Sequence, residues 1–188
     1  MLLFYQHAME AAIPMVQFAS VLEVELERGV SLKGIFDRLN TSMHRALTGR
    51  TFVCFAMAQL DPASRRLRLG NGGCPYPYHF RAATGEVEEI SLDAYPLGVR
   101  EGSEYTLAEL ILEPGDRIVI SSDGLIEATD EAGDIFGFEK VKDSIQRGCQ
   151  EGLSAMALTQ RLMAEVDAFC NAEPQGDDRT VVVLRVES

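Results

Sequence analysis

The sequence predicts an α+β protein in which helices pack on antiparallel sheets. Three observations along its 188 residues predict this class. Two helical segments come first, a block of short strand-like segments follows, and two more helices precede a last strand. Because no internal repeat and no linker rich in Gly, Ser or Pro divides the chain, we expect one domain over residues 1–188.

The N-terminal part predicts two helices. The first is expected at Glu10–Leu26, with Pro14 near its first turn, where a missing N–H matters least. Ser31 is a residue of the type that caps a helix, and apolar residues then recur at the i, i+3, i+4 and i+7 spacing of a second helix. The stripe that this second helix is expected to bury consists of Leu32, Ile35, Phe36, Leu39 and Met43.

From residue 51 the pattern changes to short strands separated by turn residues. The expected strands are 51–60, 65–71, 76–81, 86–92, 105–112 and 117–121. Turns such as Glu113-Pro114-Gly115-Asp116, where Asp116 is expected to be a turn residue, join them into an antiparallel meander. Helices return at 138–147 and after a Ser154 cap, and residues 180–186 form the expected final strand.

The charge of the chain limits its partners. A net charge of −12 argues against nucleic acid or an anionic membrane as the main partner, because both are polyanions. A phosphate-bearing substrate would need bound cations, since carboxylates alone would repel it.

The cysteines and the N-terminus favour a soluble, cytoplasmic protein. The four cysteines show no Cys-x-x-Cys spacing, so free thiols in a reducing compartment are expected rather than a zinc site. Residues 1–22 contain several polar residues and no basic leader, which predicts neither a signal peptide nor a membrane span of about 20 apolar residues. The histidines show no ligand spacing, and His44 and His79 are expected at a surface or an interface.

Two short acidic elements late in the chain are the candidate functional residues. Asp123-Gly124 follows the apolar run 118–120, and Asp177-Asp178 precedes the apolar run 181–183. Each element puts a carboxylate at the end of a predicted strand, and carboxylates suit hard divalent cations such as Mg²⁺ or Mn²⁺. Asp-Gly and Asp-Asp are also common in solvated turns, so these residues alone leave both interpretations open.

Six segments occur in an order that resembles one protein family, and the resemblance as a whole covers roughly residues 8–186. They are Phe52–Asp61, Leu67–Pro75, Pro96-Leu97-Gly98, Leu112-Glu113-Pro114-Gly115-Asp116, Ser121–Ala128 followed by Phe136-Gly137, and Gly176–Thr180. This order resembles the SpoIIE/RsbU-like branch of the metal-dependent (PPM, type 2C) serine/threonine protein phosphatases. The resemblance implies an antiparallel β-sandwich flanked by helices in αββα layers, here without the N-terminal strands of the family.

The resemblance also implies a cofactor and its ligands. In the complete family site two Mn²⁺ or Mg²⁺ ions activate a bound water, so no side chain acts as nucleophile. Carried over, Asp123 and Asp177 are expected as metal ligands, and Asp178 is the lesser candidate of the pair. Gly124 permits the tight backbone after the ligand, and Thr180 supports the loop.

The sequence departs from the family at two places. Gln6–Ala12 aligns with the end of an N-terminal acidic motif, which puts Leu3 at the position of the ion-bridging aspartate, and a second acidic motif would lie before Met1. Cys74 stands where the family usually has histidine. One ion or none is therefore compatible with this chain. Three explanations remain open: a truncated or misassigned start, a degenerate relative, or recruitment of the missing elements from another chain, as in a homodimer.

The expected function is that of a SpoIIE-type protein serine/threonine phosphatase whose activity in this chain is weak or absent. The resemblance implies a phosphorylated protein substrate of the STAS-type anti-sigma-factor antagonist class, in a bacterial partner-switching pathway. The alternative is a catalytically dead, phosphatase-like module that binds a regulatory partner. The missing acidic motifs favour this alternative, whereas the retained Asp123 and Asp177-Asp178 favour the enzyme.

Overall fold

The computed structural model describes residues 2–47, 51–171 and 177–187, and the side chains from Ile13 onward in the first helix. Helices and antiparallel strands make up these residues, which confirms the predicted α+β class. The chain forms two compact units. The first unit comprises Met1–Pro62, Arg66–Gly73 and Leu92–Leu110, and the second comprises Ala63–Arg65, Cys74–Ser91 and Ile111–Ser188.

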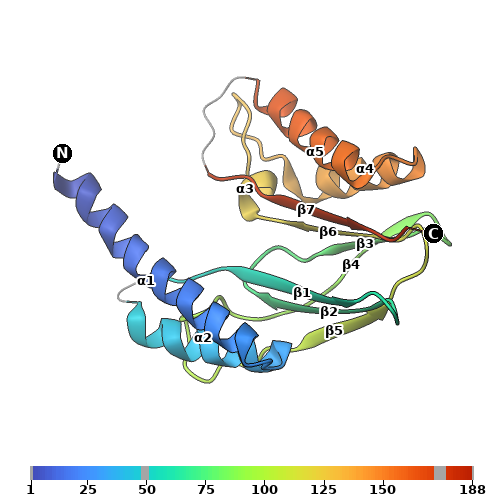
Figure 1. Cartoon of the computed structure of the whole chain (residues 1–188). Helices are drawn as coiled ribbons and strands as arrows, with labels where there is room; N and C mark the ends of the chain where they lie inside the picture. Colours follow the sequence, from blue (N-terminus) through green and yellow to red (C-terminus); the bar gives the residue numbers. More distant parts are fainter. Residues whose placement is uncertain (1, 48–50, 172–176, 188) are drawn as a thin grey trace. The chain divides into compact units, whose positions relative to one another are not determined.

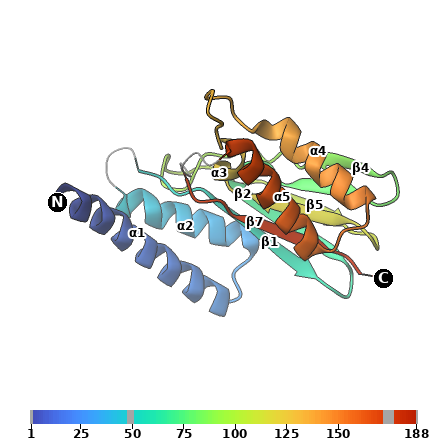
Figure 2. The same cartoon turned by 90° about the horizontal axis from the view of Figure 1, so that it is seen from above.

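The first unit combines two helices with a three-stranded sheet. Helices α1 and α2 lie side by side in both views (Figures 1 and 2). The sheet has the strand order β1-β2-β5, in which β1 and β2 pair antiparallel from Phe55↔Gly72 to Asp61↔Arg66. The elements of this unit are α1 (Leu2–Glu27), α2 (Leu32–Ala46), β1 (Phe55–Asp61), β2 (Arg66–Gly72) and β5 (Leu107–Ile111).

Helix α1 starts earlier than the sequence predicted. It begins at Leu2 rather than Glu10, and Pro14 therefore lies inside the helix instead of near its first turn. Proline in this place removes one backbone hydrogen bond to the preceding turn. The residues before it, Met9–Ala12, are good helix formers, which explains why the helix continues through this position.

Helix α2 buries the predicted stripe. All five apolar residues of the stripe are at most 3% exposed, and the Ser31 hydroxyl accepts a hydrogen bond from the N–H of Gly34 as an N-cap. Asn40, which the sequence did not single out, is also buried. Its amide donates to the carbonyl of Arg100, and its oxygen accepts from Gly98 N and the Tyr105 hydroxyl. Helix α2 thus holds the loop that precedes β5.

A glycine in β2 allows α2 to approach the sheet closely. An added Cβ at Gly70 would lie only 2.4 Å from Cε2 of Phe36. Phe36 is fully buried and packs with the rings of Phe55 and Tyr105, at centroid distances of 5.3 Å each. The ring of Phe36 therefore occupies the space that a side chain at position 70 would need.

The second unit contains a four-stranded antiparallel sheet with the order β4-β3-β6-β7. Helices α4 and α5 lie side by side against one face of this sheet (Figure 2) and share its apolar core, which includes Tyr78, Val119, Ile145 and Leu162. The elements are β3 (Tyr78–Arg81), β4 (Glu86–Glu89), β6 (Arg117–Ser121), α3 (Asp123–Ile126), α4 (Gly137–Gln150), α5 (Ala155–Cys170) and β7 (Val181–Arg185).

The strands do not form the predicted continuous meander. β1–β2 and β3–β4 are hairpins, as the turn residues between them indicate. However, β5 joins the sheet of β1 and β2, whereas β6 pairs with β3 and β7. Turn residues specify local hairpins only; long-range strand pairing depends on which apolar faces become buried together, and the sequence pattern does not encode this directly.

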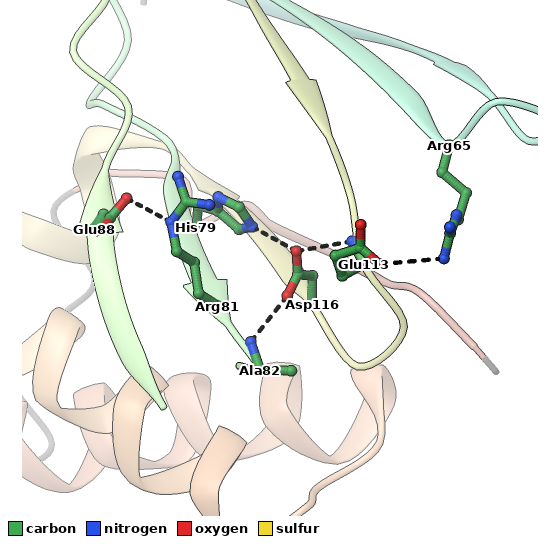
Figure 3. A network of polar contacts seen from close by, with 7 residues as sticks. All are labelled: Arg65, His79, Arg81, Ala82, Glu88, Glu113 and Asp116. Atoms are coloured by element: carbon green, nitrogen blue, oxygen red, sulfur yellow. Dashed lines mark hydrogen bonds and ion pairs between the residues drawn. The ribbon is translucent and has the colours of Figure 1, made fainter. Parts of the chain in front are cut away.

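A buried polar network links β3 to the turn before β6 (Figure 3). His79 is 1% exposed and Asp116 3%, so the prediction that His79 lies at a surface or an interface is wrong: it is buried inside the second unit. The carboxylate of Asp116 accepts from His79 Nε2 at 3.0 Å, from Ala82 N at 2.9 Å and from Glu113 N at 3.0 Å. Burial alone would raise the pKa of Asp116, but the two backbone hydrogen bonds and His79 outweigh it and hold this pKa below 3.8.

None of the helices in the described part of the chain combines the length and apolar character that a membrane span requires.

We expect Gly70→Ala to lower the free energy of unfolding by about 1–3 kcal/mol, because the new methyl group overlaps the immobile ring of Phe36. Urea denaturation measures this loss. Gly72→Ala is the matched control on the same strand, since its Cβ would meet its neighbours at ordinary distances of 3.4 and 3.5 Å. Equal losses in the two variants would contradict the close approach of α2.

The Asp116 network predicts a pH dependence of stability. A carboxyl group with a lowered folded-state pKa stabilises the protein above the unfolded pKa, and this contribution is lost as the pH falls through the lower, folded-state value. Asp116→Asn should therefore reduce the free energy of unfolding by about 1–3 kcal/mol at neutral pH, because two backbone donors compete for one amide oxygen.

The difference in stability between wild type and Asp116→Asn should shrink as the pH falls below 3.8. Urea titrations from about pH 7 to about pH 3 measure it. A difference that stays constant over this range would show that the Asp116 carboxylate does not supply the stabilisation.

Candidate active site

Asp123 lies directly after β6, at the first position of the short helix α3. Its side chain is exposed, and its Oδ1 accepts a hydrogen bond from the N–H of Gly124 at 3.0 Å. Ser122 occupies the N-cap position in an extended conformation. The predicted tight turn after the strand is therefore one turn of helix, which exposes the carboxylate at its N-terminal end.

Asp177 and Asp178 lie before β7, and both are exposed. The N–H of Asp178 donates to Oδ1 of Asp177 at 2.7 Å, a local bond that shapes the loop. Thr180 immediately precedes the first strand residue, Val181.

Ser122 joins the two acidic elements. Its hydroxyl donates to the carbonyl of Asp178 at 3.0 Å and accepts from the N–H of Thr180 at 3.0 Å. The N–H of Ser122 donates in turn to the carbonyl of Thr180 at 3.0 Å. Segments that are 56 positions apart in the sequence therefore lie side by side.

Gly124 is required by this contact rather than by an unusual backbone angle. An added Cβ at position 124 would lie 2.5 Å from the carbonyl oxygen of Asp178. The resemblance implied that this glycine permits a tight backbone, whereas in the structure it allows close packing of α3 against the loop before β7.

A small cavity of about 270 Å³ adjoins the two elements. It is lined by Gly124, Glu127, Ala128, Thr129, Cys170, Asp177 and Arg179. A larger hollow of about 680 Å³, between residues 93 and 104 of the first unit, includes none of the predicted site residues. The smaller cavity is therefore the relevant one for the acidic elements.

The donors at this site fit part of a cation site. The carboxylates of Asp123 and Asp177 are of the type that Mg²⁺ and Mn²⁺ prefer. Among the residues that the structure describes, however, no three Asp, Glu, His or Cys side chains form a group that could hold an ion. Two carboxylates on adjacent loops would supply only a portion of a coordination shell, and further oxygen ligands would be needed to enclose an ion.

Sequence reasoning missed two residues that organise the site. Ser122 has the residue type of an N-cap before Asp123, and this signal was available. Arg179 contacts α5, and no signal in the sequence pointed to that contact.

Comparison with a family model tests the resemblance directly. The model described as Stage II sporulation protein E (SpoIIE) matches residues 6–187. The chain belongs to the SpoIIE family. The match includes both compact units and both acidic elements of the SpoIIE-type chain, and it confirms the resemblance to SpoIIE/RsbU-like PPM phosphatases. None of the curated protein sequences compared with the chain matches it.

Solved structures confirm the PP2C-like fold. The RsbU and RsbW domains of Rv1364c from Mycobacterium tuberculosis have a TM-score of 0.74 at 20% identity, over 95% of this chain and 48% of that chain. The SiaA-PP2C domain of Pseudomonas aeruginosa has a TM-score of 0.76 at 20% identity, over 94% of this chain and 70% of that one.

A third similar structure is the phosphatase domain of SpoIIE from Bacillus subtilis, presoaked with Mn, with a TM-score of 0.58 at 19% identity. It is matched over 91% of this chain and 74% of its own. By contrast, the chain spans only about half the length of the Mycobacterium tuberculosis protein. At these identities the likeness establishes the fold.

We expect Ser122→Ala to lower the free energy of unfolding by about 1–2 kcal/mol, because the carbonyl of Asp178 and the N–H of Thr180 both lose their partner. Ser144→Ala is the matched control, since this buried hydroxyl in α4 has no hydrogen-bond partner among the described residues. Urea denaturation of both variants makes the comparison. A loss in Ser144→Ala as large as in Ser122→Ala would contradict the role of the Ser122 hydroxyl.

Proposed function

We propose that this SpoIIE-family chain is a protein serine/threonine phosphatase domain, a single functional domain over residues 1–188. It hydrolyses phosphoserine or phosphothreonine on a protein regulator. The observation that carries the proposal is the pair of hydrogen bonds from Ser122 to the loop before β7, which brings the Asp123 and Asp177 segments together. Family membership supports the same assignment.

Asp123 and Asp177 are the proposed ligands of Mn²⁺ or Mg²⁺, and Asp178 is the lesser candidate. Such an ion, when bound, activates water and neutralises the charge of a phosphoryl group. The chain's own contribution is to place the carboxylates: Gly124 lets the two loops approach, and Ser122 and Thr180 fix their register. The exposure of both carboxylates leaves them accessible to a phosphorylated protein.

The proposed partner is a STAS-type anti-sigma-factor antagonist. The similar protein from Mycobacterium tuberculosis combines RsbU and RsbW domains in one chain, which supports a place in such a regulatory system. The net charge of −12 adds a physical requirement, because a phosphorylated, anionic substrate must approach an acidic protein. Bound cations at the acidic loops would relieve that repulsion locally.

The second candidate function is that of a phosphatase-like module which binds a partner without hydrolysis. One observation favours it: fewer than three ligand-type side chains group together among the described residues. Leu3, at the position aligned with the bridging aspartate of the family, has a hydrocarbon side chain that cannot coordinate an ion. The two functions differ in whether the chain binds Mn²⁺ at all.

The test measures Mn²⁺-dependent hydrolysis of p-nitrophenyl phosphate and of a phosphoserine protein by the purified chain. Because the set of ligands is small, we expect slow hydrolysis that needs Mn²⁺. Asp123→Ala and Asp177→Ala should each reduce it about tenfold or more. Asp143→Ala, an exposed acid on α4, is the control and should leave the rate unchanged.

Hydrolysis that is independent of Mn²⁺, or that survives Asp123→Ala, would contradict the proposed site. A folded chain that neither hydrolyses phosphate esters nor binds Mn²⁺ in a titration followed by electron paramagnetic resonance would favour the binding module instead.

A further inference from the structure

Arg179 is a buried cation that the proposed reaction does not use. It lies between the acidic pair and β7, and its side chain is only 6% exposed. Its neighbours in the sequence, Asp178 and Thr180, are both exposed. The chain thus turns one long, charged side chain inward from a loop that is otherwise in contact with water.

The guanidinium group of Arg179 binds the C-terminal end of α5. Its Nη1 donates to Oδ1 of Asp167 at 2.7 Å, and its Nη2 contacts Sγ of Cys170 at 3.3 Å. Cys170 is buried, whereas the side chain of Asp167 is 70% exposed. The buried Nε has no hydrogen-bond partner among the described residues.

Stability alone is a poor explanation for this arrangement. Moving a charged group out of water is costly, and one ion pair to an exposed carboxylate returns little of that cost. The orphaned Nε–H adds a further penalty for an unsatisfied buried donor. What the contact does supply is a fixed distance between α5 and the loop before β7.

That loop is held from two directions. On one side Ser122 binds the backbone of Asp178 and Thr180. On the other side the side chain of Arg179 connects this loop to α5. Arg179 also lines the 270 Å³ cavity together with Asp177 and Gly124. The residue that anchors the loop therefore lies at the wall of the candidate site.

We propose that Arg179 is a positioning residue: it fixes the Asp177–Asp178 loop on α5 and so keeps the Asp177 carboxylate beside the Asp123 segment. The inference rests on the proposed function, because the place of Asp177 matters to chemistry only if this carboxylate binds an ion. Its physical basis is preorganisation. A ligand held in place before the ion arrives loses less conformational freedom on binding than a ligand on a loose loop.

The test uses the full chain and two readouts. Hydrogen exchange of the segment 177–183 reports how firmly the loop is held, and it needs no metal. Mn²⁺ binding, followed by electron paramagnetic resonance, reports the effect on the cation site. The variants are Arg179→Ala, Arg179→Lys, which keeps the charge opposite Asp167, and Asp167→Asn, which removes the partner at an exposed position.

Arg185→Ala is the matched control. Arg185 lies at the other end of β7, and its buried Nε lies 3.5 Å from Oε1 of the exposed Glu187 but has no hydrogen-bond partner among the described residues. The substitution removes the same kind of side chain from the strand that follows the acidic loop. It leaves the contacts of the acidic loop in place.

We expect Arg179→Ala to raise exchange in the segment 177–183 about tenfold and to weaken Mn²⁺ binding about tenfold. Asp167→Asn should raise exchange about threefold, and Arg179→Lys should restore both readouts to within about threefold of wild type. Arg185→Ala should leave the start of the segment and the Mn²⁺ affinity unchanged.

Unchanged exchange in Arg179→Ala, or an equal rise in Arg185→Ala, would overturn the positioning role. Should Arg179→Ala fail to fold, Asp167→Asn and Arg179→Lys decide the question by the same readouts. Faster exchange in Arg179→Ala and Asp167→Asn supports the inference whether or not the wild type binds Mn²⁺, whereas a wild type that binds no Mn²⁺ counts against the proposed function.

Discussion

The pairing of β6 with β7 is the constraint on which the site depends. These strands run antiparallel in a register from Arg117↔Arg185 to Ser121↔Val181. The end of one strand therefore meets the start of the other, and the residues just beyond both, Asp123 and Asp177, are brought to the same end of the sheet. A shift of the register by one residue would reverse the side chains of β7 relative to the core and separate the two loops.

Polar groups fix β6 at both of its ends. At its start the buried carboxylate of Asp116 accepts hydrogen bonds from His79 and two backbone donors. Arg117 donates from the strand to the carbonyl of Cys149 in the last turn of α4 and to that of Leu153 after the helix. At its end the Ser122 hydroxyl binds the loop before β7. Hydrogen bonds are directional, so they determine position as well as adding stability. The strand that presents Asp123 is consequently a rigid part of the second unit.

Membership of the SpoIIE family supports conclusions about the fold, whereas the coordination chemistry of the site bears on whether an ion can bind. The family assignment accounts for the fold and for the order of the motifs. The chemistry depends on how many oxygen ligands surround an ion, and the described residues contribute a small set. If an ion binds there, a loop held in advance by the contacts of Ser122 and Arg179 would partly offset a small ligand set, because less ordering would be needed on binding.

The sequence by itself determined the local elements: the caps at Ser31 and Ser154, the buried stripe of α2, the limits of β6 and the two acidic loops. These features depend on neighbours within a few residues, which periodicity and residue type reveal. Only the tertiary structure decided that β5 leaves the expected meander, that His79 is buried, and that Ser122 bonds to the loop before β7 and Arg179 to α5. Each of these depends on partners distant in the chain, and a single sequence contains no local signal for which distant surfaces will be buried together.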